Sequence, residues 1–320
     1  MMKNLRGVIQ ALEDSRQVLI CSHIEPDGDS IGSQLALAEL LDSLGKEVRI
    51  VNRDPVPDRY RFLDTGDRIQ DHLPPEFQPD TVVILDCSNR ERLGRIGGLI
   101  SDGMVAVTID HHRSDPGPED PAYIDLQASS TGELIIDIIR EMDVPIDSRQ
   151  AERLYTAIFS DTGGFRFPNT TAKSLAAAAE LARCGAEPHR IAARIYERRS
   201  LASLRLLGHA LGKLDALEGG RVTMVSLEAD DLERCGAGPG EAQGIVDALI
   251  TIEDALVGVL TRQMPTGEIK VNLRTRGGLK ANKIAEALGG GGHPNAAGYR
   301  TTAPPDQART ALLAEIKKWL

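Results

Sequence analysis

Val105-Ala106-Val107-Thr108-Ile109 is a short, mostly apolar stretch that runs directly into Asp110-His111-His112, an acid followed by two imidazoles. A short apolar run of this kind predicts a buried strand of a parallel sheet. The acid and the histidines would then stand at the carboxyl end of that strand, which is where open α/β sheets bind their ligands. The stretch therefore predicts an α/β fold and places chemistry at one edge of its sheet.

The first 190 residues alternate between strand-like and helical segments. The strand-like segments are 17–22, 47–52, 81–85 and 105–109, and the helical ones are 30–44, 130–142, 148–160 and 171–184. This alternation predicts a mostly parallel sheet with helices on both faces.

A chain of 320 residues exceeds one ordinary core, so we expect two domains. We predict a catalytic metal-binding domain over 1–187, a helical connector rich in Arg, Ala and Leu over 188–217, and a smaller α/β domain with a mixed sheet over 218–320. The predicted elements of the smaller domain are a strand at 221–227, a helix at 240–250, a hairpin formed by 255–263 and 268–274, and a helix at 280–288.

Composition narrows the class of protein. The sequence has no apolar run of transmembrane length and no signal-peptide core near its start, so we expect a cytoplasmic protein with no membrane partner. The formal net charge of −10 argues against binding of long duplex nucleic acid. The four cysteines are widely spaced, and we expect them to be reduced.

Further acids and one histidine occupy equivalent places in the first domain. His23, Asp27 and Asp29 lie in the loop between the first strand and its helix, Asp86 follows the strand at 81–85, and Asp161 follows the helix at 148–160. Taken alone, Asp29 could equally be an ordinary helix cap. Several acids at one buried edge would repel one another without a cation, so the set predicts a metal site.

The ligand types indicate which metal this would be. Mixed carboxylate and imidazole ligands suit Mn²⁺ or a similar first-row ion better than structural zinc. There are enough of them for two ions that share one carboxylate. Such a pair lowers the pKa of a bound water and stabilises the oxygens of a displacement at phosphorus.

Together these motifs resemble the DHH phosphoesterase family. The pattern consists of His-x-x-x-Asp-x-Asp from His23, a strand-end acid at Asp86, Asp110-His111-His112, and Asp161-Thr162-Gly163. The run from Gly289 to Gly298 resembles the glycine-rich signature of the DHH-associated C-terminal domain, so the resemblance covers essentially the whole chain. Within the family, the chain is most similar to the bifunctional oligoribonucleases and 3'-phosphoadenosine-5'-phosphate phosphatases.

The resemblance implies a role for each motif residue. His23, Asp27 and Asp86 would bind one metal ion. Asp86 would bridge to a second ion, whose other ligands are, by the same resemblance, Asp29, His111 and Asp161. Asp110 would orient a neighbouring imidazole, and His112 would face the scissile phosphate, although spacing alone permits the two histidines to exchange roles. The family is also compatible with a homodimer.

Substrate binding is expected in the C-terminal domain. Gly290, Gly291 and Gly292 could expose backbone N–H groups to an anion, and a helix beginning after His293 would add its dipole. The alternative is a flexible connector. Between residues 262 and 283 six basic residues face one acid, and Arg274 is the best candidate for a bidentate phosphate contact. In contrast, the segment 129–132 is interpreted as an ordinary cap of the helix at 130–142.

The expected function is a two-metal phosphoesterase that hydrolyses short oligoribonucleotides to mononucleotides, and 3'-phosphoadenosine-5'-phosphate to AMP and phosphate. Short RNA or small nucleotides would be its substrates, and two divalent ions, Mn²⁺ by preference, its cofactors. One alternative is a phosphodiesterase for linear or cyclic dinucleotides such as pApA and cyclic di-AMP. A non-catalytic nucleotide or RNA sensor is another.

Overall fold

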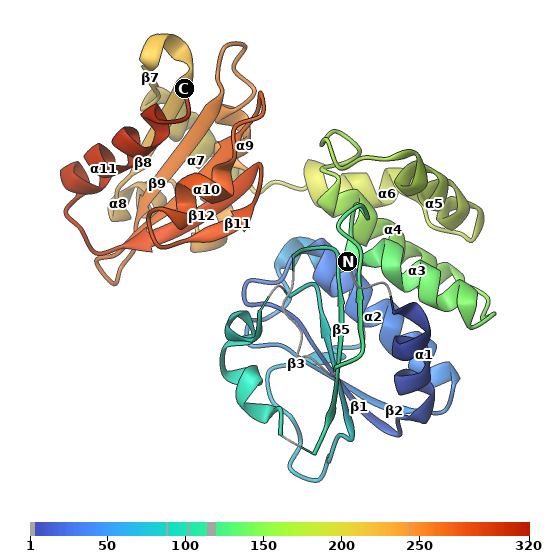
Figure 1. The fold of residues 1–320 in the computed structure, drawn as a ribbon. Coiled ribbons are helices and arrows are strands. Elements are labelled where there is room, and N and C mark those ends of the chain that lie inside the picture. Colours follow the sequence, from blue (N-terminus) through green and yellow to red (C-terminus); the bar gives the residue numbers. More distant parts are fainter. Residues whose placement is uncertain (1–3, 88, 102, 114–119, 243) are drawn as a thin grey trace. The chain divides into compact units, whose positions relative to one another are not determined.

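The computed structural model describes residues 4–87, 89–101, 103–113, 120–242 and 244–320. The chain forms two compact units, and the boundary between them in the sequence falls between Arg198 and Arg199 (Figure 1). This point lies within the segment 188–217 that the sequence analysis assigns to a connector.

The first unit is an α/β domain around a six-stranded sheet in which every neighbouring pair is parallel. Its strands are β1 (Gln17–Cys21), β2 (Glu47–Val51), β3 (Ile69–Gln70), β4 (Thr81–Leu85), β5 (Val105–Asp110) and β6 (Ala122–Ile124). Its helices are α1 (Leu5–Asp14), α2 (Gly28–Ser43), η1 (Asp58–Leu63), η2 (Arg90–Leu99), α3 (Thr131–Glu141), α4 (Ser148–Asp161), α5 (Ala172–Arg183), α6 (Pro188–Ala192) and η3 (Ala193–Glu197).

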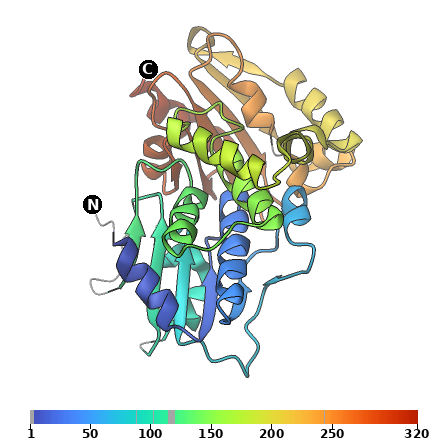
Figure 2. The same ribbon diagram turned by 90° about the vertical axis from the view of Figure 1, so that its right-hand side faces the viewer.

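Both faces of this sheet are covered, as the sequence predicts. Val83 and Val107 pack under α1, α2, α3 and α4 on one face, and Val82 packs under η2 on the other. Figure 2 shows α1, α2 and α3 on the same side of the sheet. Strands buried on both faces must be apolar throughout, and all five residues of β4 are buried.

The order of the strands determines where a ligand can bind. The sheet runs β3-β2-β1-β4-β5-β6, so the direction of strand addition reverses between β1 and β4. At such a switch point the loops after the two strands part and leave a crevice at their carboxyl ends.

The second unit contains a six-stranded mixed sheet, in the order β11-β12-β10-β9-β8-β7, with only β8 and β9 parallel. Its strands are β7 (Asp215–Leu217), β8 (Val222–Leu227), β9 (Val257–Gln263), β10 (Ile269–Thr275), β11 (Gly291–His293) and β12 (Ala296–Thr301). Its helices are α7 (Leu201–Gly212), η4 (Glu218–Gly220), α8 (Ala229–Arg234), η5 (Pro239–Ala242), α9 (Ile245–Leu249), α10 (Ala281–Glu286) and α11 (Pro305–Lys317). The predicted mixed sheet is therefore confirmed.

Three details of the sequence prediction are wrong. The end of the predicted helical connector is a strand, β7, which pairs with β8. The predicted helix at 240–250 is divided into η5 and α9, because Gly244 adopts a left-handed backbone with φ of 86°. No helix begins after His293, because Pro294 and Asn295 form a two-residue turn that leads into β12.

A buried ion cluster joins α7 to α8 in the second unit. Asp231 is 2% exposed, and its carboxylate accepts hydrogen bonds from His209 Nε2 and Lys213 Nζ, each at 2.7 Å. Burial by itself would raise the pKa of Asp231, but the contacts with Lys213, His209 and the Glu228 backbone N–H outweigh it and lower that pKa to about 2.

We expect Asp231→Asn to lower the free energy of unfolding of the second unit by about 2 kcal/mol at neutral pH. A depressed carboxyl pKa contributes stability that is fully present above the unfolded pKa of about 4 and is lost as the pH falls through the folded value. The difference between wild type and variant should therefore vanish towards pH 2. Urea unfolding followed by the fluorescence of Trp319, the only tryptophan, reports on this unit. A difference that persisted undiminished at pH 2 would contradict the assignment.

Candidate metal centre

Three neighbouring strands deliver the candidate ligands to one edge of the first sheet. His23 follows β1, Asp86 follows β4, and Asp110 is the last residue of β5. β1 and β4 flank the switch point. The amino end of α2, with Asp27 as its N-cap and Asp29 in its first turn, therefore reaches the same crevice.

One group of possible ligands comprises His23, Asp27 and Asp86, each with a ligand atom within 4.8 Å of the others. His23 Nε2 lies 3.5 Å from Asp86 Oδ2. The other ring nitrogen, Nδ1, is 2.8 Å from the Ile24 carbonyl oxygen, to which it can donate. That bond turns Nε2 towards the site, where it would offer its lone pair to a bound cation, as is usual for metal-binding histidines.

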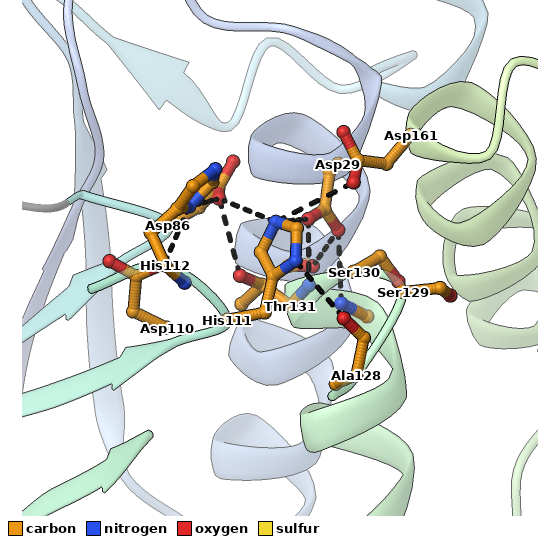
Figure 3. Close-up of polar contacts among 12 residues, drawn as sticks. Asp29, Asp86, Asp110, His111, His112, Ala128, Ser129, Ser130, Thr131 and Asp161 are labelled. Atoms are coloured by element: carbon orange, nitrogen blue, oxygen red, sulfur yellow. Dashed lines mark hydrogen bonds and ion pairs between the residues drawn. The ribbon is translucent and has the colours of Figure 1, made fainter. Parts of the chain in front are cut away.

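A second group comprises Asp29, His111 and Asp161, under the same distance limit. His111 Nε2 lies 3.7 Å from Asp29 Oδ2, 3.6 Å from Asp161 Oδ2 and 3.6 Å from Asp86 Oδ1. Its Nδ1 is 3.3 Å from the Ala128 carbonyl oxygen. Figure 3 shows this imidazole surrounded by the three carboxylates.

Asp86 belongs to the first group and also faces the second, because its Oδ1 lies 3.6 Å from His111 Nε2. Its Oδ2 faces His23, while its Oδ1 faces His111 and lies 3.4 Å from His112 Nδ1. The side chain is almost fully buried, and the backbone has a φ of 53°. A left-handed backbone at a residue other than glycine is uncommon, and such strain is concentrated at functional sites.

Asp110 orients His112. Its Oδ1 accepts hydrogen bonds from the His112 backbone N–H at 2.9 Å and from His112 Nδ1 at 2.8 Å, and the carboxylate is completely buried. His112 remains 22% exposed. Asp86, His111 and His112 also form a third group within the distance limit, so the geometry permits His112 as a ligand. The exchange of roles between the two histidines therefore stays open.

The charges of the site explain why a cation would fit. Burial raises the pKa of Asp29 and of Asp161 well above the usual range, and neighbouring carboxylates raise both further. Burial would also raise the pKa of Asp86, but hydrogen bonds from His112 and His23 outweigh it and hold that pKa well below its usual value. A divalent cation among these oxygens would offset the repulsion, so the donor set fits such an ion.

The amino end of α3 supports the site in a way that the sequence analysis missed. Ser130 caps this helix through the Glu133 N–H, as expected. In addition, the Thr131 and Gly132 N–H groups donate to Asp29 at 2.7 and 2.9 Å. More than one hundred residues separate these groups in the chain, so no local pattern could have linked the cap to a metal ligand.

Asn169 is a second residue that sequence reasoning missed. Its Nδ2 lies 3.3 Å from Asp161 Oδ2, 3.1 Å from the Asp161 carbonyl oxygen and 3.0 Å from the Ser129 carbonyl oxygen. One amide therefore joins the end of α4 to the start of α3. Its proximity to the Asp161-Thr162-Gly163 motif was the only available signal.

The predicted substrate residues lie in the second unit. Arg274 on β10 and His293 on β11 are both in register with Ala296 of β12. The Arg274 guanidinium is held by Asp247 of α9, with 2.6 Å between Nε and Oδ1. The side chain of His293 lies outside what the structure describes.

The glycine run forms part of the sheet and is not a flexible connector. Gly290 donates its N–H to the Ala285 carbonyl oxygen, and Gly291 and Gly292 pair with β12. A Cβ on Gly290 would lie 2.2 Å from the Gly298 carbonyl oxygen, so only glycine fits this backbone contact. β11 is the edge strand of the sheet.

Comparison with known proteins extends over the whole chain. The model of the DHH family, N-terminal domain, matches residues 17–158, and that of the DHHA1 domain matches residues 219–320. The chain is 35% identical to a bifunctional oligoribonuclease and PAP phosphatase NrnA of Thermus thermophilus, an alignment that covers 100% of this chain and 94% of the relative.

Two further proteins are similar to this chain, one in its fold and one that is named for its dependence on manganese. The crystal structure of an exopolyphosphatase-related protein from Bacteroides fragilis is 25% identical, with a TM-score of 0.89 over 98% of this chain and 96% of that one. A probable manganese-dependent inorganic pyrophosphatase of Bacillus mycoides is 31% identical over 52% of this chain and 54% of its own length.

We expect Mn²⁺ to raise the melting temperature of the first unit and Asp86→Asn to abolish most of this effect. At about 100 times the dissociation constant, a ligand of the folded state adds about 2.7 kcal/mol, or roughly 5–10 °C for a unit of this size. Calorimetry with and without Mn²⁺ measures the shift, and Asp71→Asn, which alters an exposed carboxylate, is the matched control. An equal shift in the Asp86 variant would contradict the shared role of this residue.

We expect Asn169→Ala to weaken metal binding about 10- to 100-fold, as loss of a residue that orients a ligand usually does. Mn²⁺ titration by calorimetry provides the measurement. Asn282→Ala removes an amide that donates to Glu286 in the second unit and should leave the affinity unchanged. If Asn169→Ala bound Mn²⁺ as tightly as wild type, the amide would have no part in holding Asp161.

Proposed function

The chain belongs to the DHH family, with a C-terminal DHHA1 domain, and on this premise we propose that it is a metal-dependent phosphoesterase of short oligoribonucleotides and of 3'-phosphoadenosine-5'-phosphate. The observation that carries the proposal is the pair of adjoining ligand groups, with Asp86 in the first group and 3.6 Å from His111 of the second. The Thermus thermophilus relative, which aligns over the full chain, is named for both activities.

The proposed cofactors are two divalent ions, with Mn²⁺ supported by the manganese-dependent relative. His23, Asp27 and Asp86 would hold one ion, and Asp29, His111 and Asp161 the other. Asp86, whose Oδ1 lies 3.6 Å from His111 Nε2, would bridge to the second ion. When bound, such a pair supplies a hydroxide nucleophile at neutral pH and neutralises charge on phosphate oxygens.

The residues of the chain have separate tasks in the proposed reaction. Asp110 accepts the Nδ1 proton of His112 and so fixes the ring in one orientation. Hydrogen bonds to Asp110 and Asp86 outweigh the effect of burial and raise the pKa of His112 well above its usual value. A partly exposed imidazole held in this orientation can contact an oxygen of the scissile phosphate and stabilise the charge that develops there.

Substrate binding is proposed for the second unit. Arg274 offers a planar guanidinium whose orientation is fixed by Asp247 before any phosphate arrives. Gly291, Gly292 and His293 form β11, the edge strand of the same sheet, and Gly290 precedes it. Backbone groups on the outer side of an edge strand can face an anion.

The structure bears on some of the remaining sequence expectations and leaves others as predictions. No helix within the described ranges is long and apolar enough to cross a membrane. The homodimer remains a prediction, as does the inability to bind long duplex nucleic acid. The sensor alternative gains no support, since every candidate ligand position carries a residue able to bind metal.

A substrate panel tests the proposal. We expect purified protein with Mn²⁺ to hydrolyse 3'-phosphoadenosine-5'-phosphate and di- to pentaribonucleotides faster than cyclic di-AMP or pyrophosphate, with products resolved by chromatography. Asp86→Ala should reduce all turnover by at least roughly 1000-fold, because it removes the carboxylate that faces both ligand groups. Asp71→Ala, at an exposed site, is the control. Preferred hydrolysis of a cyclic dinucleotide, or substantial activity in folded Asp86→Ala, would refute the proposal.

A further inference from the structure

Aromatic side chains gather on the first unit next to Asp161. Aromatic residues make up only 3% of the sequence, yet Phe159 lies 5.6 Å from Phe165 and 5.6 Å from Tyr196, measured between ring centroids. Tyr155 is 5.8 Å from Phe159. The cluster begins within α4 and extends across the loop that leaves Asp161 to reach η3.

The loop after Asp161 brings two of the rings against its backbone. Gly163 and Gly164 have φ values of 59° and 70°. A Cβ on Gly163 would lie 2.5 Å from the ring of Phe167, and one on Gly164 would lie 3.3 Å from the ring of Tyr196. Both rings therefore rest on the segment that directly follows a predicted metal ligand.

These two rings are partly exposed to solvent. Phe167 is 44% exposed and Tyr196 is 42% exposed, whereas Phe159, whose ring centroid lies 5.6 Å from that of Tyr196, is 8% exposed. A partly exposed ring can stack on a nucleobase, because every base has a π-face.

Guanidinium groups accompany the rings. The Arg166 guanidinium lies 5.1 Å from the Tyr196 centroid, and its Nε donates to the Gly163 carbonyl oxygen at 2.6 Å. Arg194 lies 4.9 Å above Phe62, and Arg59 lies 4.7 Å above Tyr60. Within the part of the chain that the structure describes, none of these three arginines forms an ion pair with a carboxylate.

Further contacts join Tyr60 and Phe167 to the segment that carries Asp161. The Tyr60 hydroxyl is 2.8 Å from Ser160 Oγ, one residue before Asp161. The Phe167 N–H donates to the Thr162 carbonyl oxygen, one residue after Asp161. The formal net charge of the protein is −10. Arginines that form no ion pair with a described carboxylate, next to partly exposed rings, complement a chain of phosphates and bases.

We propose that Phe167, Tyr196 and Arg166 form a subsite that binds the nucleotides of a short RNA beyond its reacting phosphate. The inference rests on the proposed function and deepens it, because it separates the two substrate classes. An oligoribonucleotide can stack its further bases on the two rings and place a phosphate at Arg166. 3'-Phosphoadenosine-5'-phosphate has no further nucleotide to do so.

The test compares the two substrates in single variants of the full chain. We expect Phe167→Ala and Tyr196→Ala each to lower the ratio of kcat/KM for a pentaribonucleotide to that for 3'-phosphoadenosine-5'-phosphate by about ten-fold, the usual effect of losing one stacked base. Phe167→Tyr and Tyr196→Phe keep the rings and should keep the ratio. Arg166→Gln should flatten the salt dependence of KM for the pentamer by about one phosphate contact.

Leu175→Ala is the control, because Leu175 is 50% exposed on α5 of the same unit and has no role in the subsite. An unchanged ratio in both alanine variants overturns the inference. So does an equal loss on both substrates, which would show that the rings only support Asp161. A change of oligomeric state in sedimentation with an unchanged ratio would assign the surface to contacts between copies of the chain, and also overturns it.

Binding distinguishes this inference from the proposed function. If wild type hydrolysed neither substrate, the proposed function would fail, and the fluorescence anisotropy of a labelled pentaribonucleotide would still test the subsite. About ten-fold weaker binding of the pentamer by Phe167→Ala supports the subsite in that case, and equal binding overturns it.

Discussion

The buried carboxylate of Asp86 is the constraint on which the rest of the site depends. It stands where the order of strand addition reverses, with a left-handed backbone and both oxygens facing imidazoles. A charge in this position is costly unless it is compensated. Hydrogen bonds from His23 and His112 supply that compensation and hold its pKa low, even though burial acts in the opposite direction. Asp86 can face both ligand groups because β4 lies between β1 and β5.

The other carboxylates of the site show how the surrounding fold positions ligands. Asp29 is held by two backbone N–H groups of α3, and Asp161 is held by the amide of Asn169. Partners of this kind fix the orientation of a ligand before a metal ion binds. α3 and α4 therefore support both the core of the sheet and the geometry of the site.

If the proposed subsite binds RNA, the segment that follows Asp161 serves both the metal centre and the substrate. Asp161 ends α4 and faces the metal centre, and the glycines that follow bring Phe167 and Tyr196 against the backbone on the outside. A base bound there would lie a few residues from a metal ligand. The second unit contributes Arg274, whose guanidinium is already oriented by Asp247.

Much of the fold was predictable because the signals are local. A short apolar run such as 81–85 is typical of a strand that is buried on both faces. In the structure, β4 begins and ends at those residues. The failures were also local in cause. A left-handed Gly244 divides the helix predicted at 240–250, and the turn at Pro294 and Asn295 replaces the helix expected after His293. The helices α1 and α11, which lie outside the recognised motifs, were not predicted at all.

The sequence by itself determined which side chains are available as ligands and that parallel strands would bring them to one edge. It also determined the family, since the motifs are short and contiguous. Only the tertiary structure decided how Asp86 faces both ligand groups, that Asp110 orients His112, and that α3 and Asn169 hold the remaining acids. These contacts join elements that are distant in sequence, and their geometry follows from strand order and helix packing, which no local pattern records.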